Sequence, residues 1–241
     1  MGGRQSAADL TEIEDALRAQ WALLRRWVGQ LDDASRIAPT ILGAWTVEDL
    51  VAHLGRAMDA LAAAQPAPAG TVPLSLGEYV GTYAGRAQEI SDITHDLAQR
   101  IRTDPLPAVD AMAEAAFAQL LVLRGLAPDP VIQARRAPIL LSEMLLSRLI
   151  ELVIHGDDLA RSTTVAGPAP LHPPAVRLVA DALLEITVDR GGWLVEIVDP
   201  LKWIRLACGR VPYDVNSLAR ALQPVHTSDS LPDLGSLLPL L

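Results

Sequence analysis

The apolar segment 139–162, "ILLSEMLLSRLIELVIHGDDLARS", constrains the fold more than any other part of the chain. Its hydrophobic residues recur at helical spacing around most of the circumference, which predicts a helix enclosed by other helices. Glu143, Arg148 and Glu151 interrupt the run, so it lacks the roughly 18 uncharged residues of a membrane-spanning helix. We therefore expect it to form the core helix of a bundle.

Composition and periodicity predict partners for this helix. Half of the 241 residues are hydrophobic but only 4% are aromatic, which favours packed helices over sheets. Apolar residues at three- and four-residue steps predict four further helices, at about 6–31, 46–64, 76–103 and 108–126. The fold class expected from the sequence is therefore mainly α.

The proline-rich stretch "AGPAPLHPP" at 166–174 is the best candidate for a linker between two domains. It divides the chain into a helical bundle, 1–165, and a small C-terminal domain, 175–241. In the latter we expect a helix at about 175–189, a strand within "WLVEIV" and a short helix through "LKWIRLAC". This piece is too small to be stable alone and is expected to pack on the bundle as a small α/β appendage.

Charge and cysteine content exclude several classes of partner. The net charge is -9 and the arginines are dispersed, so neither nucleic acid nor an anionic membrane is expected as a partner. The single cysteine, Cys208, cannot form an internal disulfide or a cysteine-based metal cluster, which fits a reducing, cytoplasmic location. Because its helix also carries apolar residues, we expect Cys208 to be a small buried hydrophobe and not a nucleophile.

A carboxylate and an imidazole lie in the middle of the predicted core helix. Glu151 and His155 are four residues apart and therefore share one helix face. A desolvated charge needs a partner, and Arg148, in helical register with Glu151, can supply one as a purely structural ion pair. Alternatively, His53 in "DLVAHLG" can join them to give two imidazoles and one carboxylate, a three-ligand site for zinc or a related divalent ion with an open position. Spacing alone leaves both interpretations open.

Two motifs carry a family resemblance. "AWTVEDLVAHLG" and the later "RLIELVIHGDDLAR" resemble the metal-binding, DinB-like N-terminal domain of actinobacterial mycothiol-dependent maleylpyruvate isomerases, over roughly residues 7–161. The resemblance implies a four-helix-bundle core and mycothiol as the thiol cofactor. It also implies a divalent metal, expected to be zinc, held by His53, Glu151 and His155.

The resemblance extends to residues around this site. It implies that Arg86 acts in catalysis by holding a substrate carboxylate; the alternative is an arginine that reaches the surface from the apolar side of its helix. Asp157 and Asp158 are candidates to orient an imidazole, or else belong to a solvated helix end. No residue is assigned to binding the thiol cofactor.

The C-terminal segment carries a second, separate resemblance. "DPLKWIRLACGR" and "LPDLGSLLPLL" resemble a sterol-carrier-like domain that is shortened here, because its middle is missing between residues 192 and 199.

The resemblance implies a divalent-metal-dependent, mycothiol-using enzyme. The expected activity is isomerisation or thiol S-transfer on a small electrophile, by a monomer or a homodimer. Two alternatives remain. One is a non-catalytic helical scaffold that binds a hydrophobic ligand or a protein partner, and the other is a metal-dependent hydrolase that uses a metal-bound water.

Overall fold

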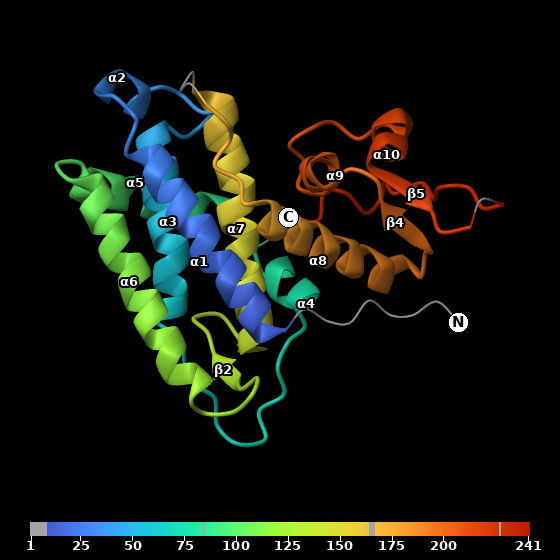
Figure 1. Cartoon of the computed structure of the whole chain (residues 1–241), viewed down its shortest axis with the longest axis horizontal. Coiled ribbons are helices and arrows are strands. Elements are labelled where there is room, and N and C mark those ends of the chain that lie inside the picture. The colour runs from blue at the N-terminus through green and yellow to red at the C-terminus, as the bar shows by residue number, and fades with distance from the viewer. Residues whose placement is uncertain (1–8, 84, 164–166, 227) are drawn as a thin grey trace.

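The computed structural model describes residues 9–83, 85–163, 167–226 and 228–241. Four long helices form a bundle (Figure 1): α1 (Leu10–Val28), α3 (Val47–Ala62), α6 (Pro105–Arg124) and α7 (Leu141–Ser162). The colour order in Figure 1 shows that α1 and α7 run in one direction and α3 and α6 in the other. α3 packs on both α6 and α7, and α1 packs on α7. The predicted core helix, α7, therefore has neighbours on several sides.

Local sequence explains how α3 begins and how closely it packs. Thr46 and Asp49 form a capping box in which each side chain accepts from the other residue's backbone N–H, as their spacing predicts. A Cβ placed on Gly55 would lie 2.7 Å from a methyl carbon of Val109, so glycine permits the close approach of α3 to α6. The capping box thus fixes where α3 starts, and Gly55 fixes how near its partner helix lies.

The single helix predicted over 76–103 is wrong. The structure has two helices here, α4 (Leu76–Gly81) and α5 (Ala87–Ile101), because Gly85 adopts a φ of +79°, a conformation that ends regular helix. α4 packs on α7 while α5 packs on α3. Arg86 consequently stands at the N-cap of α5 and not on the apolar side of a long helix.

Short elements that the sequence did not predict lie at both ends of the bundle, with the small sheet at the lower end of Figure 1 and α2 (Asp33–Arg36) at the upper end. β1 (Gln65–Pro66), β2 (Val131–Gln133) and β3 (Pro138–Leu140) form an antiparallel sheet in that order, and α2 follows α1. The β2–β3 turn comes between α6 and α7. It carries Arg135 and Arg136 to the bundle surface.

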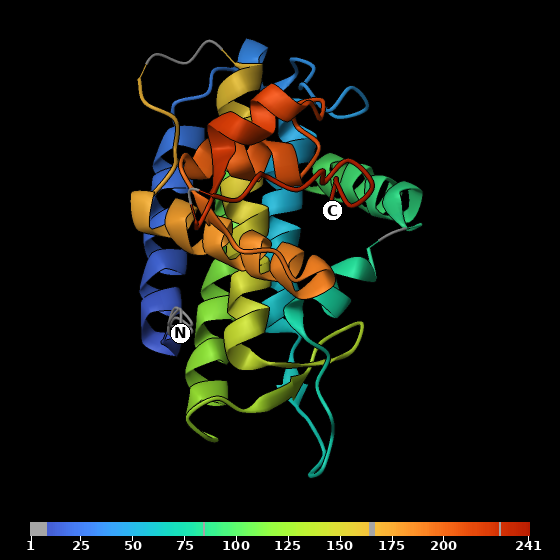
Figure 2. The same cartoon turned by 90° about the vertical axis from the view of Figure 1, so that its right-hand side faces the viewer.

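The C-terminal segment packs against the bundle through α8 (Pro173–Gly191), which contacts α1 and α7. Figure 2 shows α8, in orange, across the bundle with the rest of the segment beside it. The remaining elements are β4 (Val195–Ile197), α9 (Pro200–Ala207), α10 (Val215–Ala221) and β5 (Leu222–Pro224). α9 packs on α8 and α10, and β4 pairs with β5.

The first two helices and the strand predicted in this segment are present, whereas α10 and β5 were not predicted. Of the predicted linker, residue 166 lies outside the described residues, and Pro173 and Pro174 already belong to α8. The Gln20 side chain of α1 donates to the Pro170 carbonyl at 2.7 Å and accepts from the His172 amide at 2.9 Å. The chain before α8 is therefore held against the bundle.

One helix among the described residues, α6, is long and apolar enough to cross a membrane by length and composition alone. It lies in the bundle against α3, with Leu121 and Val122 exposed on its outer side.

Candidate metal centre

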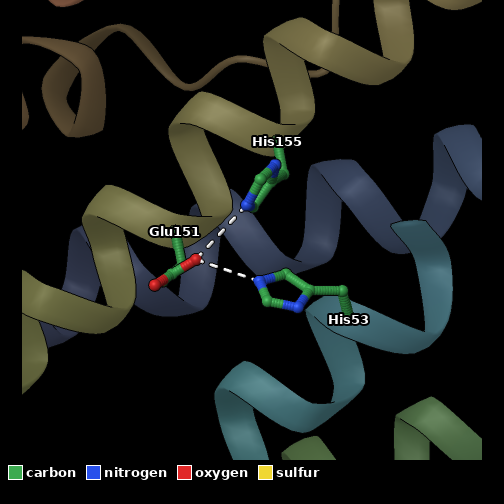
Figure 3. Close-up of side chains that lie close together, drawn as sticks. All are labelled: His53, Glu151 and His155. Carbon is green, nitrogen blue, oxygen red and sulfur yellow. Dashed lines mark hydrogen bonds and ion pairs between the residues drawn. The ribbon is translucent and has the colours of Figure 1, made fainter. Parts of the chain in front are cut away.

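His53 from α3 meets Glu151 and His155 from α7 (Figure 3). The Nε2 atoms of His53 and His155 lie 3.1 and 3.3 Å from the same carboxylate oxygen, Glu151 Oε2. The ligand atoms of all three residues lie within 4.8 Å of one another. The structure thus brings together three residues that are up to 102 positions apart in the sequence.

The donor set and its spacing fit a metal ion. Zinc binds histidine nitrogen and carboxylate oxygen at about 2.0–2.2 Å, so two ligands of a tetrahedral ion lie about 3.3–3.5 Å apart. The two nitrogen–oxygen distances, 3.1 and 3.3 Å, are close to this edge length. Three protein ligands would leave a coordination position for another molecule, as in catalytic sites.

The protonation of Glu151 and His53 suits a cation, whereas the raised pKa of His155 favours a protonated ring that would have to lose its Nε2 proton to bind one. Burial raises the pKa of Glu151, but hydrogen bonds with His155 and His53 outweigh it and hold the pKa well below its usual value. Glu151 is therefore a carboxylate at neutral pH. Burial lowers the pKa of His53, which favours a neutral ring. At His155 burial has the same effect, yet hydrogen bonds with Asp158 and Glu151 outweigh it and raise the pKa.

Each imidazole is oriented through its other nitrogen. His155 Nδ1 lies 3.0 Å from Asp158 Oδ2, and because a carboxylate only accepts, this nitrogen carries the proton. The fully buried Asp158 also accepts from Arg210 Nε at 2.9 Å. His53 Nδ1 lies 3.4 Å from the hydroxyl of the buried Thr94 on α5. These contacts turn Nε2 of both rings toward Glu151, as outer contacts do at metal sites.

Of the two adjacent aspartates proposed from the sequence, only Asp158 contacts a ring of the cluster. Asp157 accepts from Arg205 Nε and Nη2 at 2.8 and 2.7 Å and also pairs with Arg161 at 3.8 Å. It is nevertheless buried, so the interpretation as a solvated helix end is wrong for both residues. Asp157 joins α7 to α9, whereas Asp158 joins the cluster to the C-terminal segment.

An indole lies over the two imidazoles. The Trp45 ring centroid is 4.8 Å from that of His53 and 6.1 Å from that of His155. Trp45 Nε1 donates to Ser91 Oγ at 3.0 Å, and His95, on the same helix α5, pairs with Asp49 at 2.9 Å. α5 therefore fixes Trp45 and the start of α3 as well as His53.

A cavity of about 270 Å³ opens beside the cluster. Both His53 and Glu151 line it, with walls from α3, α4, α5, the β2–β3 turn and α7. Basic side chains dominate its polar lining, namely Arg56, Arg86, Arg135, Arg136 and Arg148. A small molecule in this cavity would be adjacent to the metal ligands and surrounded by guanidinium groups.

Comparison with known proteins agrees with this arrangement. Residues 17–160 match the family described as Mycothiol maleylpyruvate isomerase N-terminal domain. The chain belongs to this family. No curated protein and no solved structure matches the chain significantly. The mainly α, DinB-like fold class predicted from the sequence is confirmed, and the matched residues include His53, Glu151 and His155.

In this mycothiol maleylpyruvate isomerase N-terminal domain, Arg148 does not form the predicted ion pair with Glu151. Arg148 is buried and donates to the Tyr83 hydroxyl at 2.6 Å, the Ala57 carbonyl at 3.2 Å and Ser147 Oγ at 3.3 Å. The carboxylate faces the two histidines instead, and Figure 3 shows its second oxygen directed away from both rings. The interpretation as a structural arginine–glutamate pair is therefore wrong.

Arg86 lies at the cavity but is exposed. Its guanidinium forms an ion pair with Glu89, with Nε 2.8 Å from Oε2. This pairing occupies donors that a substrate carboxylate would need, so the catalytic role of Arg86 stays a prediction.

The mycothiol maleylpyruvate isomerase N-terminal domain has no reactive cysteine within the described residues. Cys208, in the C-terminal segment, is buried as predicted, and burial raises its pKa to about 12. It is thus a neutral thiol, and a thiol used at the cluster would have to come from a bound molecule. Sequence analysis missed Thr94 and Arg210, because neither belongs to a motif with metal-ligand spacing.

Proposed function

We propose that the protein is a divalent-metal-dependent enzyme that uses mycothiol as isomerase or thiol S-transferase on a small electrophile. One observation carries this proposal: in a domain of this family, the cluster of His53, Glu151 and His155 lies beside a cavity that His53 and Glu151 line. Five arginines line the cavity, so it suits a ligand with an anionic group better than a purely hydrophobic one. It therefore argues against a scaffold that binds apolar molecules at this place.

Two imidazoles and one carboxylate are a ligand set of catalytic zinc sites, so we propose zinc as the metal. When bound, such an ion lowers the pKa of a coordinated thiol and so supplies a thiolate at neutral pH. His53, Glu151 and His155 would hold the ion. Asp158 and Thr94 keep their rings in place, and Trp45 covers the rings.

The residues of the cavity wall have a second task. Addition of sulfur to an activated double bond moves negative charge onto the electrophile, and guanidinium groups fixed beside it stabilise that charge. The two reaction classes differ in the fate of the sulfur–carbon bond. Breaking it again gives isomerisation, whereas keeping it gives S-transfer.

The test starts with metal analysis of the wild-type protein beside His53→Ala, His155→Ala and the control His95→Ala. His95 is a histidine of α5 outside the cluster. We expect about one divalent ion per chain in the wild type and the control, and loss of the ion in both cluster variants, with circular dichroism showing that each is folded. A wild type that takes up no metal from excess zinc would refute the proposal.

Thiol dependence separates the proposed enzyme from a hydrolase. The metal-loaded protein is incubated with electrophilic substrates, with and without mycothiol. We expect turnover only when the thiol is present and only in variants that keep the metal. Turnover without thiol would show the hydrolase instead.

A further inference from the structure

Three arginines of the cavity form no ion pair with any described residue. Arg56 and Arg136 are half-buried and Arg148 is buried. The other two arginines are neutralised, Arg86 by Glu89 and Arg135 by Asp59 at 2.6 Å. Unpaired guanidinium groups next to one another are costly, because each partly desolvated charge repels the others.

Tyr83 holds two of these groups in fixed positions. The guanidinium of Arg136 lies over the face of its ring, 3.9 Å from the centroid, and Arg148 donates to its hydroxyl. Arg136 Nη1 is buried and has no hydrogen-bond partner among the described residues. Because Arg136 also lines the cavity, the wall contains a guanidinium held by Tyr83 with an unused donor, which is rare for a buried polar group in a protein.

The charges around the cavity are unbalanced. Its carboxylates are Glu89, which pairs with Arg86, and Glu151, which faces the histidines. Burial and then the charge of Arg136 lower the pKa of Arg56, and burial lowers that of Arg136. A divalent ion on the cluster would add further positive charge. An anionic group between Arg56 and Arg136 would relieve the repulsion and accept from the free donors.

We infer that Arg136 and Arg56, backed by Arg148, form an oxyanion site that selects small acids as ligands of the cavity. The bound group is a carboxylate or a phosphate, whose oxygens match the forked donors of a guanidinium. Because the same cavity is lined by His53 and Glu151, an anion held there places the rest of a small ligand beside the metal cluster. The anion site itself does not depend on the proposed function. Only the further step, that the bound acid is the electrophile on which the enzyme acts, rests on it.

This assignment differs from the expectation for Arg86. Arg136 comes from the β2–β3 turn, and its donors are free, whereas those of Arg86 are engaged by Glu89. Arg136 is thus assigned as the residue that distinguishes acidic from uncharged ligands.

The test is calorimetric titration of the full chain with succinate, inorganic phosphate and uncharged succinamide. We compare the wild type with Arg136→Met, which keeps an unbranched stem, and with Arg220→Met, which removes the same charge from exposed α10 outside the cavity. Arg136→Met is expected to weaken anion binding roughly 10- to 100-fold, the usual effect of losing charge-assisted hydrogen bonds. Arg220→Met should leave it unchanged, and succinamide should not bind. Tighter binding of succinate than of phosphate would identify the natural ligand as a carboxylate, and tighter binding of phosphate would identify it as a phosphate.

Arg136→Lys provides a second variant that keeps the charge but loses the fork, and it is expected to bind anions more weakly than the wild type. Absence of anion binding by the wild type would overturn the inference, and so would equal losses in Arg136→Met and Arg220→Met. Metal content is measured on the same samples. If the wild type binds metal but no anion, the inferred anion site is refuted and the proposed function is not affected. If it binds anions but no metal, the anion site is supported and the proposed metal-dependent enzyme is refuted.

Discussion

Asp158→Asn is predicted to weaken metal binding and to destabilise the fold, because the same buried carboxylate orients His155 and pairs with Arg210. Asp158 accepts from His155 Nδ1 at 3.0 Å and from Arg210 Nε at 2.9 Å. Asparagine has the same shape, but it has no charge and its NH₂ group replaces one acceptor with a donor. If the amide oxygen faces His155, Arg210 Nε keeps only its longer contact of 3.1 Å; if the NH₂ group faces His155, the imidazole loses its acceptor.

The size of both effects follows from these contacts. Removing a residue that orients a ligating histidine costs about 10- to 100-fold in metal affinity. Loss of the charged partner of Arg210 costs several kcal/mol when the pair is fully buried. Because the Arg210 side chain is 23% exposed, we expect a smaller loss in the free energy of unfolding, about 2–3 kcal/mol.

Asp157→Asn is the matched control. Asp157 is equally buried and loses its bonds to Arg205, so a loss of about 1–3 kcal/mol in stability is expected. It touches neither imidazole, so metal affinity should stay within about threefold of wild type. Affinity is measured by competition with a chelator and stability by urea unfolding of metal-free protein. Equal losses of metal affinity in the two variants would refute the orienting role of Asp158.

Three further outcomes are expected. Thr94→Val should weaken metal binding several-fold in the chelator assay, whereas Thr94→Ser should not, because the contact with His53 is made by the hydroxyl. Equal metal affinities of the Val and Ser variants would contradict this role of the hydroxyl. Burial raises the pKa of Glu143, so the folded state binds this proton more tightly than the unfolded chain does. Above the unfolded pKa, the Glu143 carboxyl therefore lowers the free energy of unfolding as pH rises. Glu143→Gln, which keeps an acceptor for the Leu76 amide, should therefore raise the urea midpoint at pH 7.5 but not near pH 4, and a pH-independent gain would count against this cause. Cys208 should resist iodoacetamide at pH 8 until urea is added, as mass spectrometry would show; rapid labelling of native protein would contradict its burial.

The sequence was informative where regular helices dictate position. The spacing of Glu151 and His155 places both on one face of α7, and the capping box at Thr46 sets the start of the helix that carries His53. That these two helices face each other follows from the family resemblance and not from spacing. The fold class and the meeting of the three residues could therefore be anticipated.

The surroundings of the cluster could not be anticipated, because they depend on irregular backbone. The helix break at Gly85 moves Arg86 to the surface, and the turn in "ARRAP" brings Arg136 to the cavity. A short turn has no periodicity from which a side-chain direction can be predicted. Arg210 lies beyond the predicted bundle, so its pairing with Asp158 depends on how the C-terminal segment packs.

The position of Trp45 gives the protein an optical probe at its candidate metal centre. Its indole lies beside both histidine rings, whereas the other tryptophans belong to α1 or to the C-terminal segment. A paramagnetic ion such as Co²⁺ bound by those rings would quench the emission of Trp45 before that of more distant indoles. The difference between wild-type and Trp45→Phe spectra would then report occupancy of the cluster in real time, without substrate and without a label.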